Sequence, residues 1–221
     1  EKLPDYEFML WDFNRFDIHS SQWVKEAFSK KKYAFAADYI RLYALYNYGG
    51  IYMDMDVEVL KSFDPFLKLK TMICFENSKQ VEKGAAWVKE CLKYYENRPF
   101  IKADGMLDTV TLPFIIQQIC LKDSYHLEHA YSIEEALQKE MGSTLAVLSS
   151  DFFSPKTTFR DEKIVLTSNT VSIHHFKGTW LPWYSKIEKR VSNALGFESK
   201  DFIRAAIYKI QLEIAKRKIK K

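Results

Sequence analysis

Four charged side chains between residues 38 and 56 have types and a spacing that could do chemistry: Asp38, Arg41, Asp54 and Asp56. Asp54 and Asp56 are separated by one residue. Neighbouring carboxylates repel each other, so such a pair persists most easily beside a cation or several hydrogen-bond donors. Oxygen ligands suit a hard divalent ion such as Mg²⁺ or Mn²⁺, which keeps open positions for substrate phosphates. The triplet D-x-D taken alone also fits an inert acidic turn.

The residues before this acidic pair are predicted to form a buried helix. Residues 34–48 contain only three charged or amide side chains, Asp38, Arg41 and Asn47, so the helix is apolar nearly all round. Asp38 and Arg41 stand one helical turn apart and share a face. Leaving either charge unpaired in the interior would cost about 3–5 kcal/mol. The two side chains could form a structural ion pair or hold a bound molecule.

Gly49 and Gly50 should end this helix and turn the chain into a short buried strand at residues 51–53. Glycine readily adopts the left-handed backbone that closes a helix. If the extended conformation continues, alternation points Asp54 and Asp56 to one face and the intervening methionine to the other. The combination of D-x-x-R, helix, Gly-Gly, apolar strand and D-x-D is far more specific than the triplet alone.

The run YAFAADYIRLYALYNYGGIYMDMDVEVLKSF resembles the sugar-binding D-x-D region of family 32 glycosyltransferases. These enzymes are relatives of the yeast initiating mannosyltransferase and include many bacterial capsule and lipopolysaccharide transferases. The same spacing also resembles the catalytic domains of the large clostridial glucosylating toxins. The resemblance is dense over residues 1–76 and continues in order to about residue 185. It implies a GT-A fold and the transfer of a sugar from a nucleotide-diphosphate sugar.

A second group of candidate residues lies in the run IHHFKGTWLPW, residues 173–183. It resembles the family 32 ending and the His-Phe-x-Gly-x-x-Lys-Pro-Trp segment of family 8 transferases, with Leu181 in place of the lysine. That resemblance implies His175 as a metal ligand, with His174 as the alternate, because imidazole is acceptable to Mn²⁺. Either histidine could instead be a core residue. Trp180 could stack on a sugar or simply pack.

The resemblance also implies a role for each candidate residue. Asp56 is the leading metal ligand, and Asp54 acts through water or contacts the ribose and sugar hydroxyls. Asp38 and Arg41 would grip the sugar and fix its reacting carbon toward the acceptor. The predicted catalytic residues are therefore Asp54, Asp56 and Arg41. The predicted substrate-binding residues are Asp38, Arg41, Asp54, Tyr39, Trp180 and Asn77. Asn77 begins a region, residues 77–85, that is shorter than in the resembling bacterial proteins.

Composition limits the class of protein. The 221 residues, 15% of them aromatic, suit a packed globular enzyme. The net charge of +4 is modest and gives no strong nucleic-acid signal. No stretch approaches the roughly 20 apolar residues of a membrane span. The chain begins at Glu1, and the resembling families open with an earlier strand that helps to hold the nucleotide. We therefore expect a truncated form of a longer protein.

The order of elements predicts an α/β fold, because strands alternate with helices. Predicted strands span residues 6–11, 51–53, 57–63, 71–76, 145–148 and 170–174, and predicted helices span 22–30, 34–48, 85–97, 109–121 and 133–141. Ser20 or Ser21 should cap the first helix, and Ser132 the last, with Glu135 at its third position. We expect a GT-A-like catalytic domain at 1–185 and a helical extension at 186–221.

The function predicted from these features is metal-dependent transfer of a hexose to a saccharide or glycolipid acceptor, in cell-surface polysaccharide synthesis. The donor is a UDP- or GDP-hexose, the cofactor is Mn²⁺ or Mg²⁺, and family resemblance implies retention of configuration. Two alternatives remain. A phosphohydrolase of the haloacid dehalogenase type also places D-x-D after a strand, although its fifth motif position is normally Thr or Val, whereas this chain has Glu58. A non-catalytic module that binds carbohydrate or nucleotide sugar is the other.

The basic tail FIRAAIYKIQLEIAKRKIKK is predicted to form an amphipathic helix. Such a helix could be solvated on its polar face or could dock on anionic lipid. The expected location is the cytoplasm, with possible peripheral contact at the inner face of the membrane.

Overall fold

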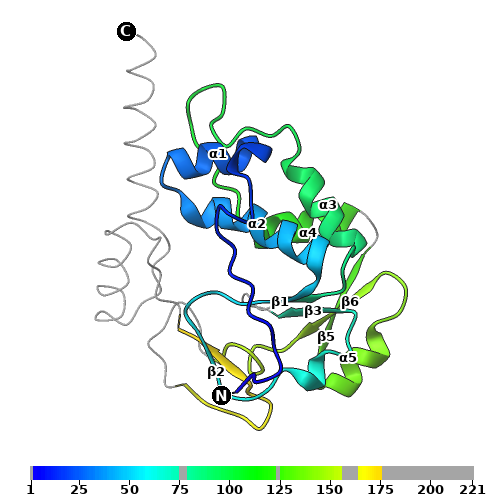
Figure 1. Cartoon of the computed structure of the whole chain (residues 1–221). Coiled ribbons are helices and arrows are strands. Elements are labelled where there is room, and N and C mark those ends of the chain that lie inside the picture. Colours follow the sequence, from blue (N-terminus) through cyan, green and yellow to red (C-terminus); the bar gives the residue numbers. More distant parts are fainter. Residues whose placement is uncertain (1, 75–78, 123–124, 156–163, 176–221) are drawn as a thin grey trace, which may run out of the picture.

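A computed structural model describes residues 2–74, 79–122, 125–155 and 164–175. The predicted residues Asn77 and Trp180 and the predicted extension at 186–221 lie outside these ranges. The described part is a mixed α/β fold, as the alternation of strands and helices predicted (Figure 1). Within the described residues, no helix has both the length and the apolar character needed to cross a membrane.

The elements follow one another in an α/β order. The helices are α1 (Gln22–Ser29), α2 (Tyr33–Tyr48), α3 (Ala86–Tyr95), α4 (Leu112–Lys122) and α5 (Ile133–Lys139), with short 3₁₀ turns at Ile18–Ser20 and Asp64–Phe66. The strands are β1 (Gly50–Tyr52), β2 (Val57–Val59), β3 (Thr71–Cys74), β4 (Lys79–Val81), β5 (His126–Ala130), β6 (Thr144–Leu148) and β7 (Ser172–His174).

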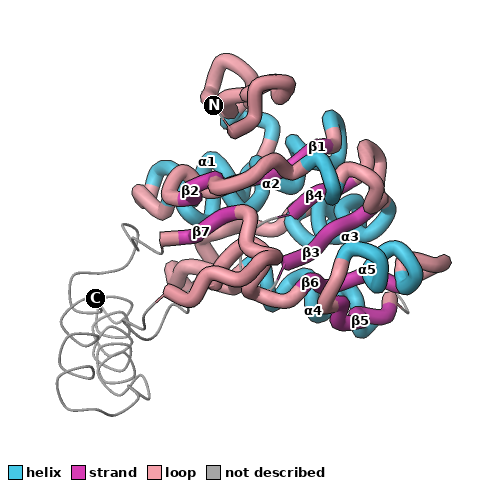
Figure 2. Tube along the Cα trace, turned by 90° about the horizontal axis from the view of Figure 1, so that it is seen from below, coloured by secondary structure: helices cyan, strands magenta, loops and turns pink. Residues whose placement is uncertain are grey.

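The strands form one larger sheet and one small ribbon. The five-stranded sheet has the order β1-β4-β3-β6-β5, in which β3, β6 and β5 are parallel and β4 is antiparallel to both of its neighbours. Strands β2 and β7 pair antiparallel as a separate ribbon. Figure 2 shows this ribbon set apart from the larger sheet. The ribbon matters for function because it brings residues near 57 beside residues near 174.

Side chains of β3 and β6 pack into hydrophobic cores on both faces of the larger sheet. Helices α2 to α4 lie on one side of the sheet with α1 packed on the far side of α2, and α5 lies on the other side of the sheet (Figure 1). Ile73 and Leu145 point into the core beneath α1 to α4, whereas Ala146 and Leu148 point into a second core with Ala136 of α5. This alternation along β6 follows from the period of two residues in a strand. Helices therefore flank the sheet on both sides, and its edge strand β1 directly follows α2.

All five predicted helices are present, and two predicted caps are confirmed. The Ser21 side chain accepts a hydrogen bond from the Val24 amide, and the Ser132 side chain accepts one from the Glu135 amide.

The strand predicted at 6–11 is wrong, because this segment forms no strand in the structure. It is held by side chains instead: the Tyr6 hydroxyl donates to Asp64 at 2.8 Å. The Trp11 ring packs edge-on to two tyrosines of α2. Strands β4 and β5 were not predicted.

Gly49 closes α2 in a position that has no room for a side chain. Its φ is +72°, and a Cβ there would lie 2.9 Å from the Lys83 nitrogen and 3.0 Å from the Val81 oxygen. Both neighbours are backbone atoms, so they cannot move aside cheaply. Gly50 also has a positive φ, of +91°, but a Cβ there would have no neighbour within 4 Å. The close approach at Gly49 joins α2 and β1 to the edge of β4.

We predict that Gly49→Ala lowers the free energy of unfolding by roughly 3 kcal/mol, because left-handed strain costs about 1–2 kcal/mol and forced overpacking about 1–3 kcal/mol. Gly50→Ala is the matched control and should cost only the strain, about 1–2 kcal/mol. Urea denaturation of both variants measures the difference. Equal stability of the two variants would contradict the close approach.

Asp151 ties the segment before β7 to the rest of the fold. Its carboxylate accepts hydrogen bonds from the Ser149 hydroxyl, from the Thr167 hydroxyl at 2.9 Å and from the Asn169 amide at 3.1 Å. Burial opposes ionisation of Asp151, but these hydrogen bonds outweigh it and lower its pKa below the ordinary value of 3.8. The ionised carboxylate therefore helps to position β7.

This lowered pKa predicts a pH dependence of stability. The stabilisation is complete above the unfolded-state pKa of Asp151 and is lost as the pH falls through its lower folded-state pKa. Asp151→Asn should cost about 1–3 kcal/mol at neutral pH, since a hydrogen-bonded charge is lost, and should flatten the acid limb of the stability profile. Urea denaturation across acidic pH measures both effects. Asp5→Asn, at an exposed position, should leave the profile unchanged. An Asp151→Asn profile that superimposes on wild type would contradict the assignment.

Candidate metal centre

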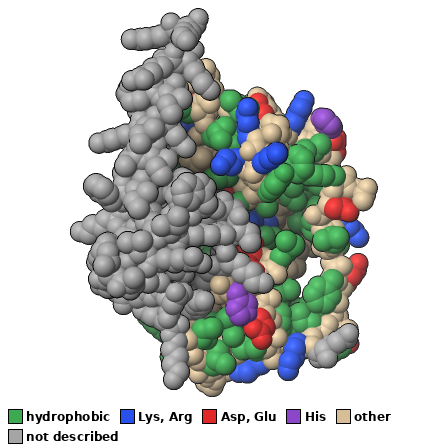
Figure 3. Space-filling view, turned by 90° about the vertical axis from the view of Figure 1, so that its left-hand side faces the viewer, with side chains coloured by type: hydrophobic (Ala, Val, Ile, Leu, Met, Phe, Trp, Pro, Cys, Tyr) green, Lys and Arg blue, Asp and Glu red, His purple; other side chains and the backbone are tan. Residues whose placement is uncertain are grey.

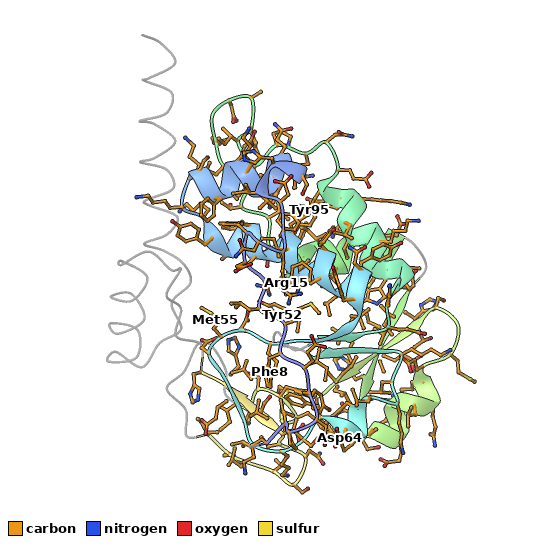
Figure 4. All side chains as sticks on the ribbon, viewed as in Figure 1. Phe8, Arg15, Tyr52, Met55, Asp64 and Tyr95 are labelled. Atoms are coloured by element: carbon orange, nitrogen blue, oxygen red, sulfur yellow. The ribbon has the colours of Figure 1, made fainter. Side chains whose placement is uncertain are left out.

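Three elements far apart in sequence bring charged side chains to one place. Helix α2 carries Asp38 and Arg41, the turn after β1 carries Asp54 and Asp56, and β7 ends with His174. Figure 4 shows the labelled Tyr52 between α2 and the ribbon, and the labelled Met55 at the outer edge of the same region. Arg41 lies beside both Asp38 and Asp54, and His174 lies beside both Asp54 and Asp56, so the four residues that the sequence singled out share one neighbourhood.

The two aspartates are brought together by a turn, not by an extended strand. Strand β1 ends at Tyr52, and the Val57 amide donates to the Asp54 carbonyl at 3.2 Å, which closes a tight turn over Met55. The Met55 side chain is fully exposed. The predicted alternation of an extended strand through Asp54 and Asp56 is thus wrong, because the chain turns at this point. The Asp54 and Asp56 side chains nevertheless reach the same partner, His174.

His174, not His175, faces the acidic pair. The His174 Nε2 lies 2.9 Å from the Asp56 Oδ1 and 3.8 Å from the Asp54 Oδ2, and His174 is buried. His175 points away and its Nε2 lies 2.9 Å from the exposed Glu58 carboxylate. The physical reason is the ribbon register, which sets His174 opposite Val57 and so beside the end of the acidic turn. The structure therefore places the alternate, His174, beside the acidic pair and His175 beside Glu58, while metal ligation by either histidine stays a prediction.

Ligand atoms of Asp54, Asp56 and His174 all lie within 4.8 Å of one another. Two carboxylates and one imidazole suit a divalent ion that accepts mixed oxygen and nitrogen ligands. Among the described residues, this is the one cluster of three or more His, Cys, Asp or Glu side chains close enough together to hold a metal ion. The arrangement fits the donor set predicted for Asp54 and Asp56, while their role in metal binding stays a prediction.

Arg41 links the helix to the acidic turn. Its guanidinium lies 3.4 Å from the Asp38 Oδ1 and 3.6 Å from the Asp54 Oδ1, and stacks over the Tyr52 ring at 4.5 Å. Only 11% of the Arg41 side chain is exposed. Burial works against the charge of Arg41, but Tyr52, Asp38 and Asp54 outweigh it and raise its pKa. Arg41 therefore stays charged and fixes the position of the turn.

Tyr52 belongs to this site, although sequence reasoning missed it. Its hydroxyl donates to the Asp54 Oδ1 at 2.7 Å, while its ring lies beneath Arg41. Burial and then the Asp54 carboxylate raise the pKa of Tyr52, against the effect of Arg41, so the hydroxyl keeps its proton for this bond. The sequence spacing could have predicted this contact, because Tyr52 precedes Asp54 by two residues and residues i and i+2 of an extended segment share a face.

The site carries an excess of negative charge. Asp38, Asp54 and Asp56 contribute three carboxylates and Arg41 contributes one guanidinium, which leaves two negative charges among these four groups. A divalent cation would balance this excess. Arg41 reduces the repulsion between the carboxylates without neutralising it, so the site can exist before a cation arrives.

The remaining predicted substrate-binding residues, Tyr39, Asn77 and Trp180, have no described contact with Asp54, Asp56 or His174. The Tyr39 ring packs edge-on to Phe16 and Tyr95, with centroid distances of 5.9 Å and 5.6 Å, in the core between the helices. Burial raises the pKa of Tyr39. Its predicted contact with a sugar stays a prediction. The predicted contacts of Asn77 and Trp180 fall outside the described residues.

The two neighbouring histidines allow a matched test of the centre. We predict that His174→Ala weakens Mn²⁺ binding at least about 10–100-fold, because it removes a candidate ligand and loss of even an outer-shell partner costs that much. His175→Ala should bind Mn²⁺ within about twofold of wild type, since its imidazole faces Glu58. Isothermal titration calorimetry measures both affinities. A larger loss in His175→Ala than in His174→Ala would contradict the assignment.

Comparison with known proteins points to the same segment of the sequence. Residues 1–73 match the family described as the glycosyltransferase sugar-binding region containing the DXD motif. Inositol phosphoceramide mannosyltransferase 3 of Schizosaccharomyces pombe is 37% identical over 68 residues, which cover 29% of this chain and 19% of that protein. Mannosyl phosphorylinositol ceramide synthase CSH1 of Saccharomyces cerevisiae is 35% identical over 74 residues, covering 32% of this chain and 20% of that protein.

A third relative, mannosyl phosphorylinositol ceramide synthase SUR1 of Saccharomyces cerevisiae, is 35% identical over 68 residues, or 29% of this chain and 18% of that protein. The matched segments thus span about a fifth of the length of these relatives. No solved structure matches the chain significantly. Residues 1–73, which contain Asp38, Arg41, Asp54 and Asp56, therefore match the sugar-binding region of DXD-containing glycosyltransferases, the resemblance that the sequence predicted.

Proposed function

We propose that this protein is a metal-dependent glycosyltransferase that moves a hexose from a nucleotide-diphosphate sugar to a hydroxyl group of a glycolipid or saccharide. One observation carries the proposal: Asp54, Asp56 and His174 converge within 4.8 Å inside or beside the segment that matches the sugar-binding family. A structural acidic turn would have no need of a buried histidine supplied by the far end of the fold.

The proposed fold is of the GT-A type. Three features support it: a mixed sheet with parallel β3, β6 and β5, helices on both of its faces, and an acidic turn directly after β1. The β2-β7 ribbon adds His174 to this turn. Family membership of residues 1–73 points to the same fold.

Asp56, His174 and Asp54 would hold the divalent ion. The mixed imidazole and carboxylate donors favour Mn²⁺, with Mg²⁺ as the second choice. When bound, such an ion offsets the negative charge that develops on the diphosphate as the sugar leaves. The Tyr52 hydroxyl and Arg41 orient the Asp54 carboxylate, so that its second oxygen stays directed toward His174.

Asp38 and Arg41 would bind the sugar. Arg41 presents several N–H donors and Asp38 presents acceptors, and together they can fix the hydroxyl groups of a hexose. Because both come from one rigid helix, the reacting carbon of the sugar would be held in a constant position relative to the acidic turn. We propose retention of configuration, with the acceptor attacking the face that the leaving group vacates.

The relatives narrow the proposed donor and acceptor. Their names specify mannosyl transfer and an inositol phosphoceramide product or substrate. We therefore propose mannose as the sugar, GDP-mannose as the first donor to examine, and the hydroxyl of a phosphoinositol-type glycolipid as the acceptor. Cell-surface saccharides remain the second class of acceptor.

A thermal-shift screen tests the proposal. GDP-mannose, UDP-glucose and a CMP-sugar are each added with and without Mn²⁺, since a ligand that binds only the folded state raises its apparent stability. We expect one donor to raise the Tm, and only when Mn²⁺ is present. If no nucleotide sugar shifts the Tm under either condition, the proposal is wrong.

The structure gives no support to a phosphohydrolase of the haloacid dehalogenase type. Such an enzyme would need the D-x-D motif after a longer strand, whereas β1 spans only Gly50–Tyr52 and pairs antiparallel with β4. Phosphate release from generic phosphomonoesters measures that activity directly. We expect none above background.

A further inference from the structure

We infer that the turn between α1 and α2 is a docking site for an anionic lipid surface. The site, here called the lysine-aromatic patch, consists of three consecutive lysines and three exposed aromatic rings: Lys30, Lys31, Lys32, Phe13, Phe28 and Tyr33. Figure 3 shows Lys and Arg side chains beside hydrophobic ones on the upper part of the face that includes this turn. Such a combination of charge and exposed rings is typical of interfacial membrane contacts.

The aromatic part of the patch is preformed. The Phe13 and Phe28 rings meet edge-on at 4.7 Å, and Phe28 packs against Tyr33 at 5.1 Å. These rings nevertheless remain 48%, 36% and 54% exposed, respectively. A contiguous cluster of exposed rings keeps apolar area in contact with water, and insertion at the boundary between lipid headgroups and acyl chains would remove that cost.

The lysines are presented by a fixed turn. The amides of Lys30, Lys31 and Lys32 donate to carbonyls in the last turn of α1, at 3.1, 2.9 and 2.8 Å. Lys31 has a φ of +57°, a left-handed conformation that favours glycine. Lys31 therefore places a charged side chain at a position where glycine would cause less backbone strain. All three side chains are exposed.

Two nearby carboxylates, those of Glu26 and Asp12, keep their negative charge but are outnumbered by the three lysines of the patch. Glu26, the acidic residue of α1, accepts hydrogen bonds from the Ile101 amide at 2.8 Å and from Gln22. Asp12, next to Phe13, accepts from the backbone and side chain of Asn14. The surplus of positive charge beside apolar rings is complementary to a bilayer that contains acidic headgroups, and this complementarity identifies the occupant.

The patch also suits the position of the candidate metal centre. Figure 1 shows the turn between α1 and α2 on the left-hand side of the described fold, and Figure 4 shows the exposed Met55 of the acidic turn on the same side. A lipid-borne acceptor could then meet the acidic turn from the membrane surface. This last step rests on the proposed function, whereas lipid docking by the patch does not.

Co-sedimentation of the full chain with vesicles tests the inference. Phosphatidylcholine vesicles with and without phosphatidylserine are compared at low and high salt. Wild type should bind the anionic vesicles and be released by salt. Lys30→Gln, Lys31→Gln and Lys32→Gln together should weaken binding about 100-fold, because each lysine near an anionic surface contributes a roughly equal electrostatic attraction. Phe13→Ala with Tyr33→Ala should weaken it about tenfold through lost apolar burial.

Two further variants separate docking from folding and from general charge. Lys31→Gly should raise the Tm, since it relieves the left-handed strain, yet weaken vesicle binding about fivefold. Replacing Lys68, Lys70 and Lys89 together by Gln removes three exposed lysines outside the patch and should change binding by less than about twofold.

The inference is overturned if wild type does not bind anionic vesicles, or if the patch triple variant binds them as wild type does. It is also overturned if only removal of the charges in the basic tail releases the protein. Nucleotide-sugar binding is measured separately, so a failure of docking and a failure of the proposed transferase activity can be told apart.

Discussion

Asp54→Asn combined with Asp56→Asn should lower the turnover of sugar transfer at least about 1000-fold, because the two proposed ligands of a Lewis-acid ion would contribute several kcal/mol to the transition state. The fold should survive. Asparagine keeps an acceptor for the Tyr52 hydroxyl and a partner for His174. Transfer of radiolabelled mannose from GDP-mannose to a phosphoinositol glycolipid measures the loss, and circular dichroism measures the fold.

Glu58→Gln is the matched control for this double variant. Glu58 is a carboxylate two residues beyond Asp56, but it is exposed and paired with His175 outside the candidate centre. We expect its activity to stay within about threefold of wild type, since exposed ion pairs contribute little. A double variant that retained full activity would refute the metal role of the two aspartates.

Arg41→Met should destabilise the protein by about 3–5 kcal/mol, because it leaves two partly buried carboxylates without their cation. Only 15% of the Asp38 side chain and 22% of the Asp54 side chain are exposed. The loss of the contact with the Tyr52 ring adds to this cost. Urea denaturation at neutral pH measures the change. Arg41→Lys should recover only part of the stability, since a lysine cannot reproduce the planar guanidinium stack.

Two comparisons make the Arg41 result specific. Arg15→Met changes an exposed arginine and should alter stability by less than about 0.5 kcal/mol. Combining Arg41→Met with Asp38→Asn should cost less than the sum of the single variants, because one unpaired charge is removed together with its partner. A loss below about 1 kcal/mol for Arg41→Met would show that Arg41 is not the cation that holds the acidic turn.

The parts of the fold that could be predicted from the sequence are those set by local chemistry. The apolar run at 34–48 and the glycine pair predicted α2 and its end. Ser21 and Ser132 predicted two helix starts, because a serine side chain satisfies amides within its own first turn. The D-x-x-R and D-x-D spacings predicted which residues of α2 and the β1 turn would share a site.

The parts that could not be predicted depend on contacts between distant segments. The choice of His174 over His175 follows from the register of β7 against β2, more than 100 residues earlier in the chain. Strand β5 has four exposed residues out of five, so it carries no apolar alternation that could reveal it. The segment at 6–11 has a strand-like composition, but its aromatic side chains, and not its backbone, provide the contacts.

Electron paramagnetic resonance of Mn²⁺ with the full chain tests most directly whether Asp54, Asp56 and His174 form one divalent-ion site that serves a nucleotide sugar. Wild type should bind Mn²⁺ at one site, more tightly when GDP is present, and Asp54→Asn with Asp56→Asn should lose that binding. Mn²⁺ affinity that is the same in wild type and in the double variant, with or without GDP, would contradict the proposed centre.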